Sequence, residues 1–459
     1  MKLQANKLFK SKYRMTYLKG EYENIIRYNS AAGIDKMTKA HFDKNLDGHL
    51  NVINRKVLSG NYKFTYYKEK LFIKNRNSKP RMISIPTLRD RVVLKILHGI
   101  LQDVFDIKTP LVQSVIHSIK TSIVNYDSFI KIDVTNFFGS LDHEILFKKL
   151  HKSIRKKEIK NIIHEAITNP TVSDNHSRAE KPIRNKIGVP QGIPIANVLA
   201  EIYLKDFDEK YKKRRNIRFF RYVDDILILC NKTEIEEIKR EIISEIEDVY
   251  KLNVNSDKSI SGELEYGFSF LGYSLSKESA NKVLCTVKKS SKIKFEKSIV
   301  DIFSKYSKLV LKMSPKEFVF YLNLKITGSI VKKELNNFET NKKYGWLFFY
   351  SQIEDMKLLY HLDNLVKKFI EKYGLEKNLK DLEIKSFVKS FYEITQRRSS
   401  SKYIFKPDEL SLEEKKFLLI ETFNIPIRKL NTEEDIERFF GYKVRKQIKK
   451  LEEDIQNIS

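Results

Sequence analysis

The chain has few cysteines and no long apolar segment. Only Cys230 and Cys285 occur among its 459 residues, which excludes a disulfide framework and a cysteine-based zinc site. No apolar run approaches the roughly 18–20 residues that a membrane-spanning helix needs. The first ten residues also lack the apolar segment of a signal peptide. We therefore expect a cytoplasmic protein with no membrane partner.

Acidic residues are scarce relative to basic ones. The chain has 59 Asp and Glu against 87 Lys and Arg, which gives a formal net charge of +28. A surface that only keeps a protein soluble predicts a milder balance, so the excess indicates a polyanionic partner. With 41% hydrophobic residues, the chain is long enough for a folded core and more than one domain.

Three aspartates stand at the ends of apolar, β-prone segments. Asp224 and Asp225 lie between two such runs in 218–230, which predicts a buried β-hairpin with the acids at its turn. Adjacent carboxylates repel each other and resist desolvation without a cation. An ordinary Asx turn explains this pair alone, but a further strand at 129–133 also ends on a carboxylate, Asp133. Such aspartates, brought together by the fold, suit Mg²⁺, and two ions can serve phosphoryl transfer.

Several short motifs accompany these acids in a fixed order over roughly residues 25–275. They are Asn29–Thr38, Lys79–Pro86, Thr87–Arg91, Asp133–Phe138, Val189–Gly192, the Tyr-Val-Asp-Asp box at Tyr222–Asp225, Lys258, and Phe270–Tyr273. With these motifs in this order, the chain resembles a bacterial reverse transcriptase of the group II intron and retron-like superfamily. The segment Gln191–Tyr203 is most similar to the defence-associated, abortive-infection enzymes.

The resemblance implies an α+β fold of the right-hand polymerase type. Fingers and a palm, built from a mixed sheet plus helices, are followed by a helical thumb and a helical C-terminal extension. The expected boundaries are 1–120 for the N-terminal extension and fingers, with about 145–185 added to the fingers, 121–275 for the palm, 276–375 for the thumb and 376–459 for the extension. The pattern assigns no chemistry to the extension.

Local patterns predict individual helices and strands. Loose alternation over 62–73 and the segment 82–85 predict a two-stranded hairpin around a turn at 76–79. Apolar residues at helical spacing predict helices over 90–105, 148–167, 195–211, 288–310 and 318–324. Ile293 is expected on the inner side of the helix at 288–310, a short strand is expected at 252–254, and Thr432 is expected to be a helix N-cap.

The resemblance also implies a role for individual residues. The catalytic set is Asp133, Asp224, Asp225 and Lys258, and two Mg²⁺ ions (or Mn²⁺) would be held by Asp133, the Val134 carbonyl, Asp224 and Asp225. The dNTP-binding set is Lys79, Arg81, Phe138, Gln191 and Gly192. The primer and template set is Tyr222, Val223, Gly272, Tyr273, Lys288, Lys289 and Lys292. Phe138 would be a steric gate against the ribose 2′ hydroxyl, and the alternative is a core Phe, so Phe137 and Phe138 can divide these roles.

The expected function is RNA-directed DNA synthesis in bacterial anti-phage defence. Its partners would be an RNA template, expected to be a non-coding RNA, a DNA product and dNTPs. No integrase, protease or ribonuclease H pattern is present, nor a Cys/His-rich endonuclease segment after the thumb. Three alternatives stay open: a retron-type enzyme with an RNA–DNA product, protein-primed synthesis without a template, and a non-catalytic RNA-binding scaffold. A homo-oligomer or a partner defence protein is also left open.

Overall fold

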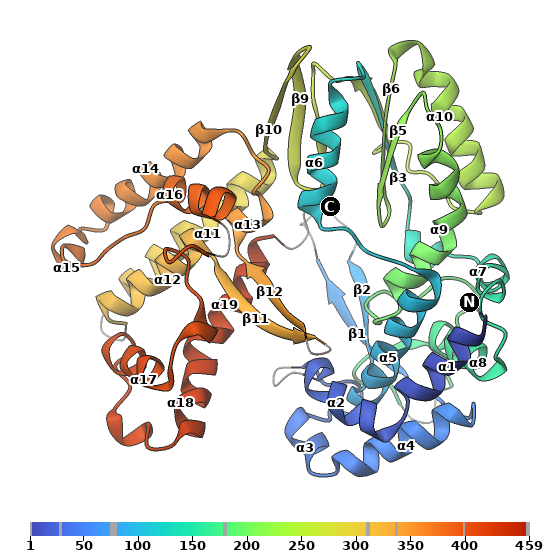
Figure 1. The fold of residues 1–459 in the computed structure, drawn as a ribbon, viewed down its shortest axis with the longest axis horizontal. Coiled ribbons are helices and arrows are strands. Elements are labelled where there is room, and N and C mark those ends of the chain that lie inside the picture. The colour runs from blue at the N-terminus through green and yellow to red at the C-terminus, as the bar shows by residue number, and fades with distance from the viewer. Residues whose placement is uncertain are drawn as a thin grey trace. The chain divides into compact units, whose positions relative to one another are not determined.

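The structure of this chain is a computed structural model that describes residues 2–26, 30–73, 80–177, 181–308, 313–335, 338–397 and 400–455 (Figure 1). It divides into two compact units. Unit 1 comprises Met1–Thr109 and Asp127–Gly262, and unit 2 comprises Pro110–Tyr126 and Glu263–Ser459. The domain boundaries expected from the sequence stay a prediction. Lys79, with the expected fingers turn at 76–79, lies outside the described residues.

Unit 1 combines helices with two small sheets. Its helices are α1 (Lys2–Lys12), α2 (Met15–Ile25), α3 (Lys39–Asp43), α4 (Leu46–Leu58), α5 (Leu88–Phe105), α7 (His143–His151), α8 (Lys157–Thr168), α9 (Ala196–Lys212) and α10 (Ile235–Ser244). Its strands are β1 (Tyr67–Phe72), β2 (Arg81–Ile85), β3 (Ser128–Asp133), β4 (Thr171–Val172), β5 (Arg218–Tyr222), β6 (Asp225–Cys230) and β7 (Ile260–Glu263).

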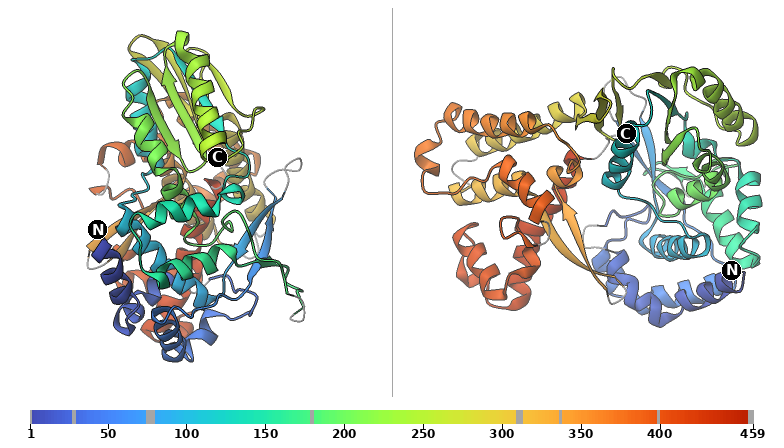
Figure 2. Two further views of the ribbon diagram at one scale, coloured as in Figure 1. Left: turned by 90° about the vertical axis from the view of Figure 1, so that its right-hand side faces the viewer. Right: turned by 45° about the horizontal axis from the view of Figure 1, so that its top comes forward.

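The larger sheet of unit 1 has the strand order β5-β6-β3-β7. Strand β6 pairs antiparallel with both β5 and β3. Facing residues of antiparallel strands point to one side of the sheet, so one side carries the row Ile130, Ile132, Ile226, Ile228 and Phe219. These five side chains belong to the main core with α9 and α10, and the helices and strands of this layer can be followed in Figures 1 and 2. The other side of the sheet carries Asp133 and Asp225.

The smaller sheet has the order β2-β1-β4. Its β1–β2 pair is antiparallel, which confirms the hairpin predicted for 62–85, and β4 adds a short parallel strand beside β1. Helix α5 follows directly, with the Thr87 side chain accepting a hydrogen bond from the Asp90 backbone as an N-cap. The predicted helix at 90–105 is thus confirmed, with a start two residues earlier.

The prediction of a single helix over 148–167 is wrong, because the structure has two helices in this region, α7 and α8. The apolar side chains Leu146, Leu150 and Ile154 follow one another at intervals of four, but the next, Ile159, comes after five residues. All four are fully buried. A single straight helix would turn one set away from the core, so α7 ends at His151 and α8 begins at Lys157.

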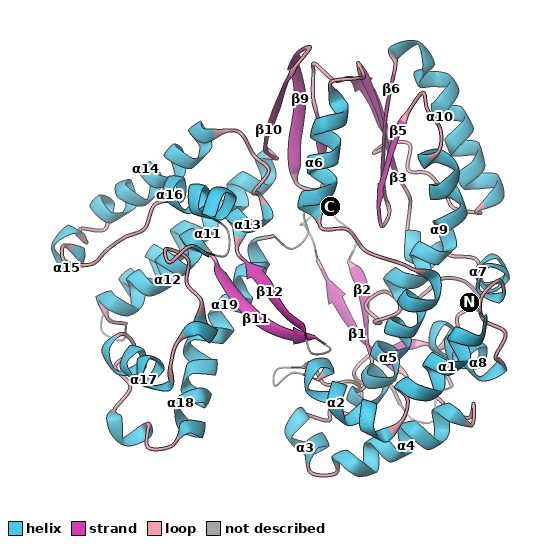
Figure 3. Cartoon of the chain, in the orientation of Figure 1, coloured by secondary structure: helices cyan, strands magenta, loops and turns pink. Residues whose placement is uncertain are grey.

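Unit 2 is mainly helical, as expected, with two small sheets. Its helices are α6 (Val112–Ile123), α11 (Lys289–Lys308), α12 (Pro315–Thr327), α13 (Trp346–Phe349), α14 (Met356–Lys372), α15 (Glu376–Leu379), α16 (Phe387–Tyr392), α17 (Leu412–Glu421), α18 (Glu433–Phe440) and α19 (Lys446–Lys450). Its strands are β8 (Phe268–Phe270), β9 (Tyr273–Ser279), β10 (Lys282–Val287), β11 (Ser329–Leu335) and β12 (Phe338–Tyr344). The hairpin β11–β12 was not expected from the sequence (Figure 3).

The C-terminal helices of unit 2 are joined to α11 and α12 by ion pairs and hydrogen bonds. Lys325 of α12 pairs with Asp454, and the ammonium of Lys443 lies 2.9 Å from the carboxylate of buried Glu317. Lys294 of α11 donates to the Glu453 carbonyl. Thr432 is the N-cap of α18, as predicted. Among the residues described, no helix is both long and apolar enough to cross a membrane.

Asp90 is a buried carboxylate that the sequence did not single out. Only 2% of the residue is exposed, and its oxygens accept hydrogen bonds from the Tyr62 and Thr87 hydroxyls and the Thr65 backbone. Burial raises the pKa of Asp90 to about 6, although these hydrogen bonds act in the opposite direction. The folded state therefore binds the proton of Asp90 more tightly than the unfolded chain does, whose carboxyl pKa is about 3.9.

We predict that ionisation of Asp90 lowers the stability of the fold as the pH rises. The contribution of the protonated group is complete below about pH 4 and is lost between about pH 4 and pH 6. Relative to Asp90→Asn, which does not titrate, the free energy of unfolding of the wild type should fall by about 3 kcal/mol across this window. Urea unfolding of both proteins at pH 4 and pH 7 measures it, and equal pH dependence of the two would contradict it.

Candidate functional site

The three aspartates meet at one end of the four-stranded sheet. Asp133 is the last residue of β3 and Asp225 the first of β6, and the two are direct partners in the antiparallel ladder. Their Cα atoms are therefore about 4.5–5.5 Å apart, and both side chains leave the same face. The register pairs Tyr222 with Asp225, so the hairpin loop consists of Val223 and Asp224. The expected turn at Asp224 and Asp225 is thus displaced by one residue.

The loop of this hairpin is strained. Val223 has a φ of 58°, in the left-handed region that a β-branched residue rarely adopts. A two-residue hairpin loop needs a positive φ at its first position to match the twist of its strands. Residues held in this way are concentrated at functional sites, where the surrounding contacts fix them.

Two lysines approach the aspartates. The ammonium of Lys258 lies 3.8 Å from the Asp133 carboxylate, and that of Lys131 lies 3.9 Å from the Asp225 carboxylate. The predicted proximity of Lys258 to the acids is thus present in the structure. Lys131 was not predicted, although it stands two residues before Asp133 in β3 and so shares its face. Each cation reduces the repulsion between the facing carboxylates.

A segment after α10 crosses the end of β3 and places Lys258. The Asn255 backbone donates to the Asp133 carbonyl, and the Asp133 backbone donates to the Ser259 hydroxyl. The strand predicted at 252–254 is absent from this described segment, where Val134 and Val254 form an isolated β-bridge instead. The Val134 side chain is buried, and the role of its carbonyl as a metal ligand stays a prediction.

The donor atoms at this edge suit a hard divalent cation. Asp133, Asp224 and Asp225 offer only carboxylate oxygens, the ligands that Mg²⁺ and Mn²⁺ take. Across the described part of the chain, no group of three or more His, Cys, Asp or Glu side chains could hold a metal by itself. Mg²⁺ commonly keeps only one or two protein carboxylates and completes its shell with water and substrate phosphates, so this set fits an ion that arrives with a phosphorylated substrate.

The two phenylalanines after Asp133 have different surroundings. Phe137 is 3% exposed and belongs to the core, whereas Phe138 is only partly buried and packs against the edge of that core. The Phe138 carbonyl accepts a hydrogen bond of 2.7 Å from the Val189 backbone. Of the two rings, Phe138 is therefore the one with surface available to a ligand.

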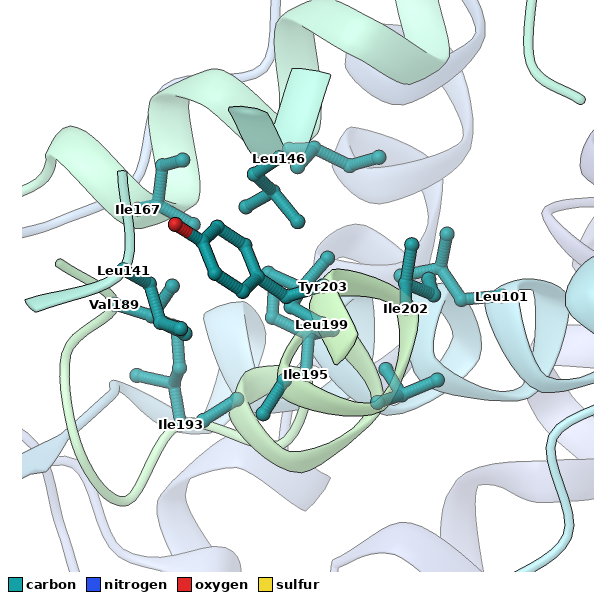
Figure 4. Close-up of a cluster of buried hydrophobic side chains, with 14 of the residues drawn as sticks. Leu101, Leu141, Leu146, Ile167, Val189, Ile193, Ile195, Leu199, Ile202 and Tyr203 are labelled. Carbon is teal, nitrogen blue, oxygen red and sulfur yellow. The ribbon is translucent and has the colours of Figure 1, made fainter. Parts of the chain in front are cut away.

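The loop at 188–192 is held against the residues that follow Asp133. Gly188 has a φ of 81°, and a Cβ there would lie 2.5 Å from the Gly139 carbonyl oxygen, so only glycine fits. Figure 4 shows Val189, Ile193 and Ile195 pointing into a buried cluster with Leu199 and other apolar residues. The loop between these anchors is thereby fixed to the core.

The same loop also joins the β1–β2 hairpin. The Ser84 backbone of β2 donates to the Gln191 carbonyl at 2.7 Å. Gly192 has a φ of 101°, and a Cβ there would lie 2.7 Å from the Ile83 side chain. Arg81 is exposed at the start of the same strand. A chain of backbone contacts therefore runs from Asp133 through Phe138 and Gln191 to the strand of Arg81.

The remaining predicted residues lie in unit 2. Leu271 and Gly272 form a two-residue hairpin between β8 and β9, both with positive φ, and the Lys288 backbone donates to the Gly272 carbonyl. Lys289 is exposed, and Lys292 is half-buried beside Glu296. Ile293, expected on the inner side of helix α11, is 54% exposed.

The expected contact of Tyr273 with a primer is wrong for its side chain. Tyr273 is fully buried, its hydroxyl donates to the Phe349 carbonyl, and its ring packs against Phe349 and Tyr350. Burial raises the pKa of the Tyr273 phenol well above its ordinary value. The side chain therefore belongs to the core of unit 2, and the turn residues Leu271 and Gly272 are buried as well.

Sequence comparison relates this chain to enzymes that copy RNA into DNA. Residues 73–275 match the family described as "Reverse transcriptase (RNA-dependent DNA polymerase)". Protein YkfC of Escherichia coli is 24% identical over 292 residues, which cover 53% of this chain and 75% of YkfC. The group II intron-encoded protein LtrA of Lactococcus lactis is 19% identical over 451 residues, which cover 81% of this chain and 70% of LtrA. The match with the putative COX1/OXI3 intron 1 protein of Saccharomyces cerevisiae (22% identity) covers 36% of that protein.

Among solved structures, the chain is similar to two telomerases. Telomerase from Candida albicans, in complex with a fragment of telomeric RNA, gives a TM-score of 0.43 at 14% identity, covering 87% of this chain and 68% of that one. Apo telomerase from Candida tropicalis gives a TM-score of 0.38 at 18% identity, covering 48% and 55%.

Proposed function

We propose that this chain adds dNTPs to a 3′ hydroxyl at Asp133, Asp224 and Asp225. Residues 73–275 are a reverse transcriptase domain, and the chain is an RNA-directed DNA polymerase. The observation that supports this site most directly is the register that sets Asp133 opposite Asp225. Reverse transcriptase domains use divalent metal ions, and two Mg²⁺ ions at these carboxylates are our assignment.

Each residue around the site would have a role set by its charge and its position. Asp133 and Asp224 would hold the ions, with Asp225 and the Val134 carbonyl in support. When bound, the ions would activate the 3′ hydroxyl and neutralise the triphosphate. Lys131 and Lys258, which lie near the carboxylates, would exchange these contacts for phosphate oxygens. Lys258 would then stand where the leaving pyrophosphate gains charge and could donate a proton to it.

The loop at 188–192 and the β1–β2 hairpin would form the nucleotide-binding surface. Arg81 can bind a phosphate through two parallel hydrogen bonds, and Lys79 is assigned beside it from the sequence. Gln191 and Gly192 would let the backbone approach the new base pair, and Gly192 leaves no room for a side chain next to Ile83 of β2. Tyr222 and Val223 would contact the primer end, and Gly272, Lys288, Lys289 and Lys292 the primer–template backbone.

Replacing a metal ligand should abolish synthesis without unfolding the protein. We expect Asp224→Asn to reduce primer extension on an RNA template with Mg²⁺ by on the order of 100-fold or more, because a neutral amide is a poor ligand for a hard cation. Asp127→Asn is the matched control. Asp127 precedes the opposite end of β3, where it accepts a hydrogen bond from the Lys232 backbone. Near-normal extension by Asp224→Asn would exclude the proposed site.

The two phenylalanines should separate substrate choice from stability. We expect Phe138→Ala to incorporate ribonucleotides more readily, because the partly exposed ring no longer blocks the 2′ hydroxyl. Phe137→Ala should instead lower the free energy of unfolding by about 3–5 kcal/mol and leave the discrimination unchanged. Single-nucleotide insertion with each dNTP and its rNTP measures the ratio. If Phe137→Ala changes the ratio and Phe138→Ala does not, the gate is assigned to the wrong ring.

We further propose that the enzyme acts in bacterial anti-phage defence on a non-coding RNA. The similarity of Gln191–Tyr203 to defence-associated enzymes and the net charge of +28 support this proposal. The test is to purify the protein from its native host and to sequence its bound nucleic acid as RNA and as DNA. A single non-coding RNA with complementary, unbranched DNA is expected. A branched RNA–DNA molecule would instead identify a retron-type enzyme, and protein-linked DNA without a matching template would identify untemplated synthesis.

A further inference from the structure

A buried guanidinium lies beside the hairpin that carries Asp224. The side chain of Arg221, in β5, is 1% exposed. It occupies the same face of the sheet as Phe219, which packs against Phe207 and Tyr211 of α9. Arg221 therefore points to the helix side of the sheet, away from the face that carries Asp133 and Asp225.

All five N–H groups of this guanidinium have acceptors. The Nε and Nη2 atoms each donate at 2.7 Å to the two oxygens of Asp208. The Nη1 and Nη2 atoms donate at 3.2 and 2.6 Å to the two oxygens of Glu201. The fifth bond, at 2.8 Å, runs from Nη1 to the Val223 carbonyl. Since an arginine has five such donors, none is left over.

Helix α9 supplies both acids in a fixed geometry. Glu201 and Asp208 are seven residues apart, which is close to two helical turns, so their side chains share one side of α9. Each carboxylate takes two parallel bonds from the guanidinium, the arrangement that restricts orientation most strongly. A lysine has three donors on one atom and cannot reproduce this set.

The hydrogen bond from Arg221 to the Val223 carbonyl connects this ion cluster to the hairpin loop of Val223 and Asp224. The peptide group that joins Val223 to Asp224 is planar, so holding its carbonyl also fixes its N–H and the position at which the Asp224 backbone begins. Val223 has a φ of 58°, a conformation that a valine leaves readily unless other contacts hold it. The Arg221 contact is such a restraint, and it acts one residue before the metal ligand.

We propose that Arg221 is a positioning residue for the metal-binding loop, held by Glu201 and Asp208 on α9 and acting through the Val223 carbonyl on the placement of Asp224. The inference rests on the proposed function only for its kinetic consequences. Arg221 touches neither substrate nor metal, so its loss should disturb the metal site more than the binding of nucleic acid.

Burial by itself would lower the pKa of Arg221, but the hydrogen bonds and charges of Asp208 and Glu201 outweigh it and raise that pKa. The guanidinium therefore keeps its charge at neutral pH. Lys212, whose ammonium lies 3.9 Å from the Asp208 carboxylate, also faces the cluster. The charge of Arg221 is thus a constant part of the support of the loop.

The test compares Arg221→Lys and Arg221→Met with Phe219→Leu. Phe219 lies on the same face of β5 and packs on the same helix, but its ring cannot donate a hydrogen bond to the loop and so controls for a general loss of stability. Each variant is assayed well below its melting temperature for kcat, for KM of the dNTP, for the Mg²⁺ concentration at half-maximal rate, and for affinity for a primer–template. Binding of Mn²⁺ to the free protein, followed by electron paramagnetic resonance, gives a readout that needs no catalysis.

For both Arg221 variants we expect kcat to fall by about 10- to 100-fold, a higher Mg²⁺ requirement, weaker Mn²⁺ binding and unchanged primer–template affinity. Phe219→Leu should lower only the melting temperature. If Arg221→Met does not fold, Asp208→Asn, which keeps the side-chain volume and loosens the guanidinium, should show the same changes to a smaller degree.

Two results separate this inference from the proposed function. If the Arg221 variants match Phe219→Leu in Mg²⁺ requirement and Mn²⁺ binding, the positioning role is wrong even when the wild type synthesises DNA. If the wild type synthesises no DNA but Mn²⁺ binding still weakens in the Arg221 variants, the positioning role stands and the proposed function fails.

Discussion

The facing of Asp133 and Asp225 across two antiparallel strands is the constraint on which the rest of unit 1 depends. Like charges at facing positions are destabilising, so the sheet must hold this register by other means. It does so through Ile130, Ile132, Ile226 and Ile228 on the opposite face, which are fully buried. A slip of one residue would turn Asp225 toward the core formed with α9 and α10 and move Ile226 and Ile228 out of it. Hydrophobic packing on one face thereby fixes the carboxylates on the other.

The parts around the acids are fixed by backbone contacts and buried groups. The segment at 253–259 crosses the end of β3, the loop at 188–192 is bonded to Phe138 and to β2, and Arg221 holds the Val223 carbonyl. The loop at 188–192 can make its contacts because Gly188 and Gly192 have no side chain to keep it away from its neighbours. Long side chains such as Lys131 and Lys258 are the adaptable elements, because they can move when a cation and a triphosphate bring new charges.

The sequence predicted those features that depend on local pattern or on short motifs. Apolar spacing and turn residues predict the β5–β6 hairpin, the β1–β2 hairpin and helices α5, α9 and α12, and the structure confirms them. Features set by tertiary partners were missed. In the sequence, Arg221 looks like any other basic residue, because Glu201 and Asp208 lie beside it only in the folded chain. Its position two residues after Phe219, on the same face of the strand, is a signal that it is buried. Tyr273 matched a primer-binding motif, yet Phe349 and Tyr350 pack against its ring. The β11–β12 hairpin has a charged sequence that does not alternate.

The central claim is that Asp133 and Asp224 hold two divalent ions that serve nucleotide addition. The most direct measurement is a crystal structure with an RNA–DNA primer–template, a non-reacting dNTP analogue and Mn²⁺, whose anomalous scattering locates the ions. We expect two Mn²⁺ ions bound by Asp133 and Asp224, with the triphosphate on one of them and the primer end beside the other. A seated primer–template and nucleotide with Mn²⁺ bound away from these carboxylates would contradict this assignment.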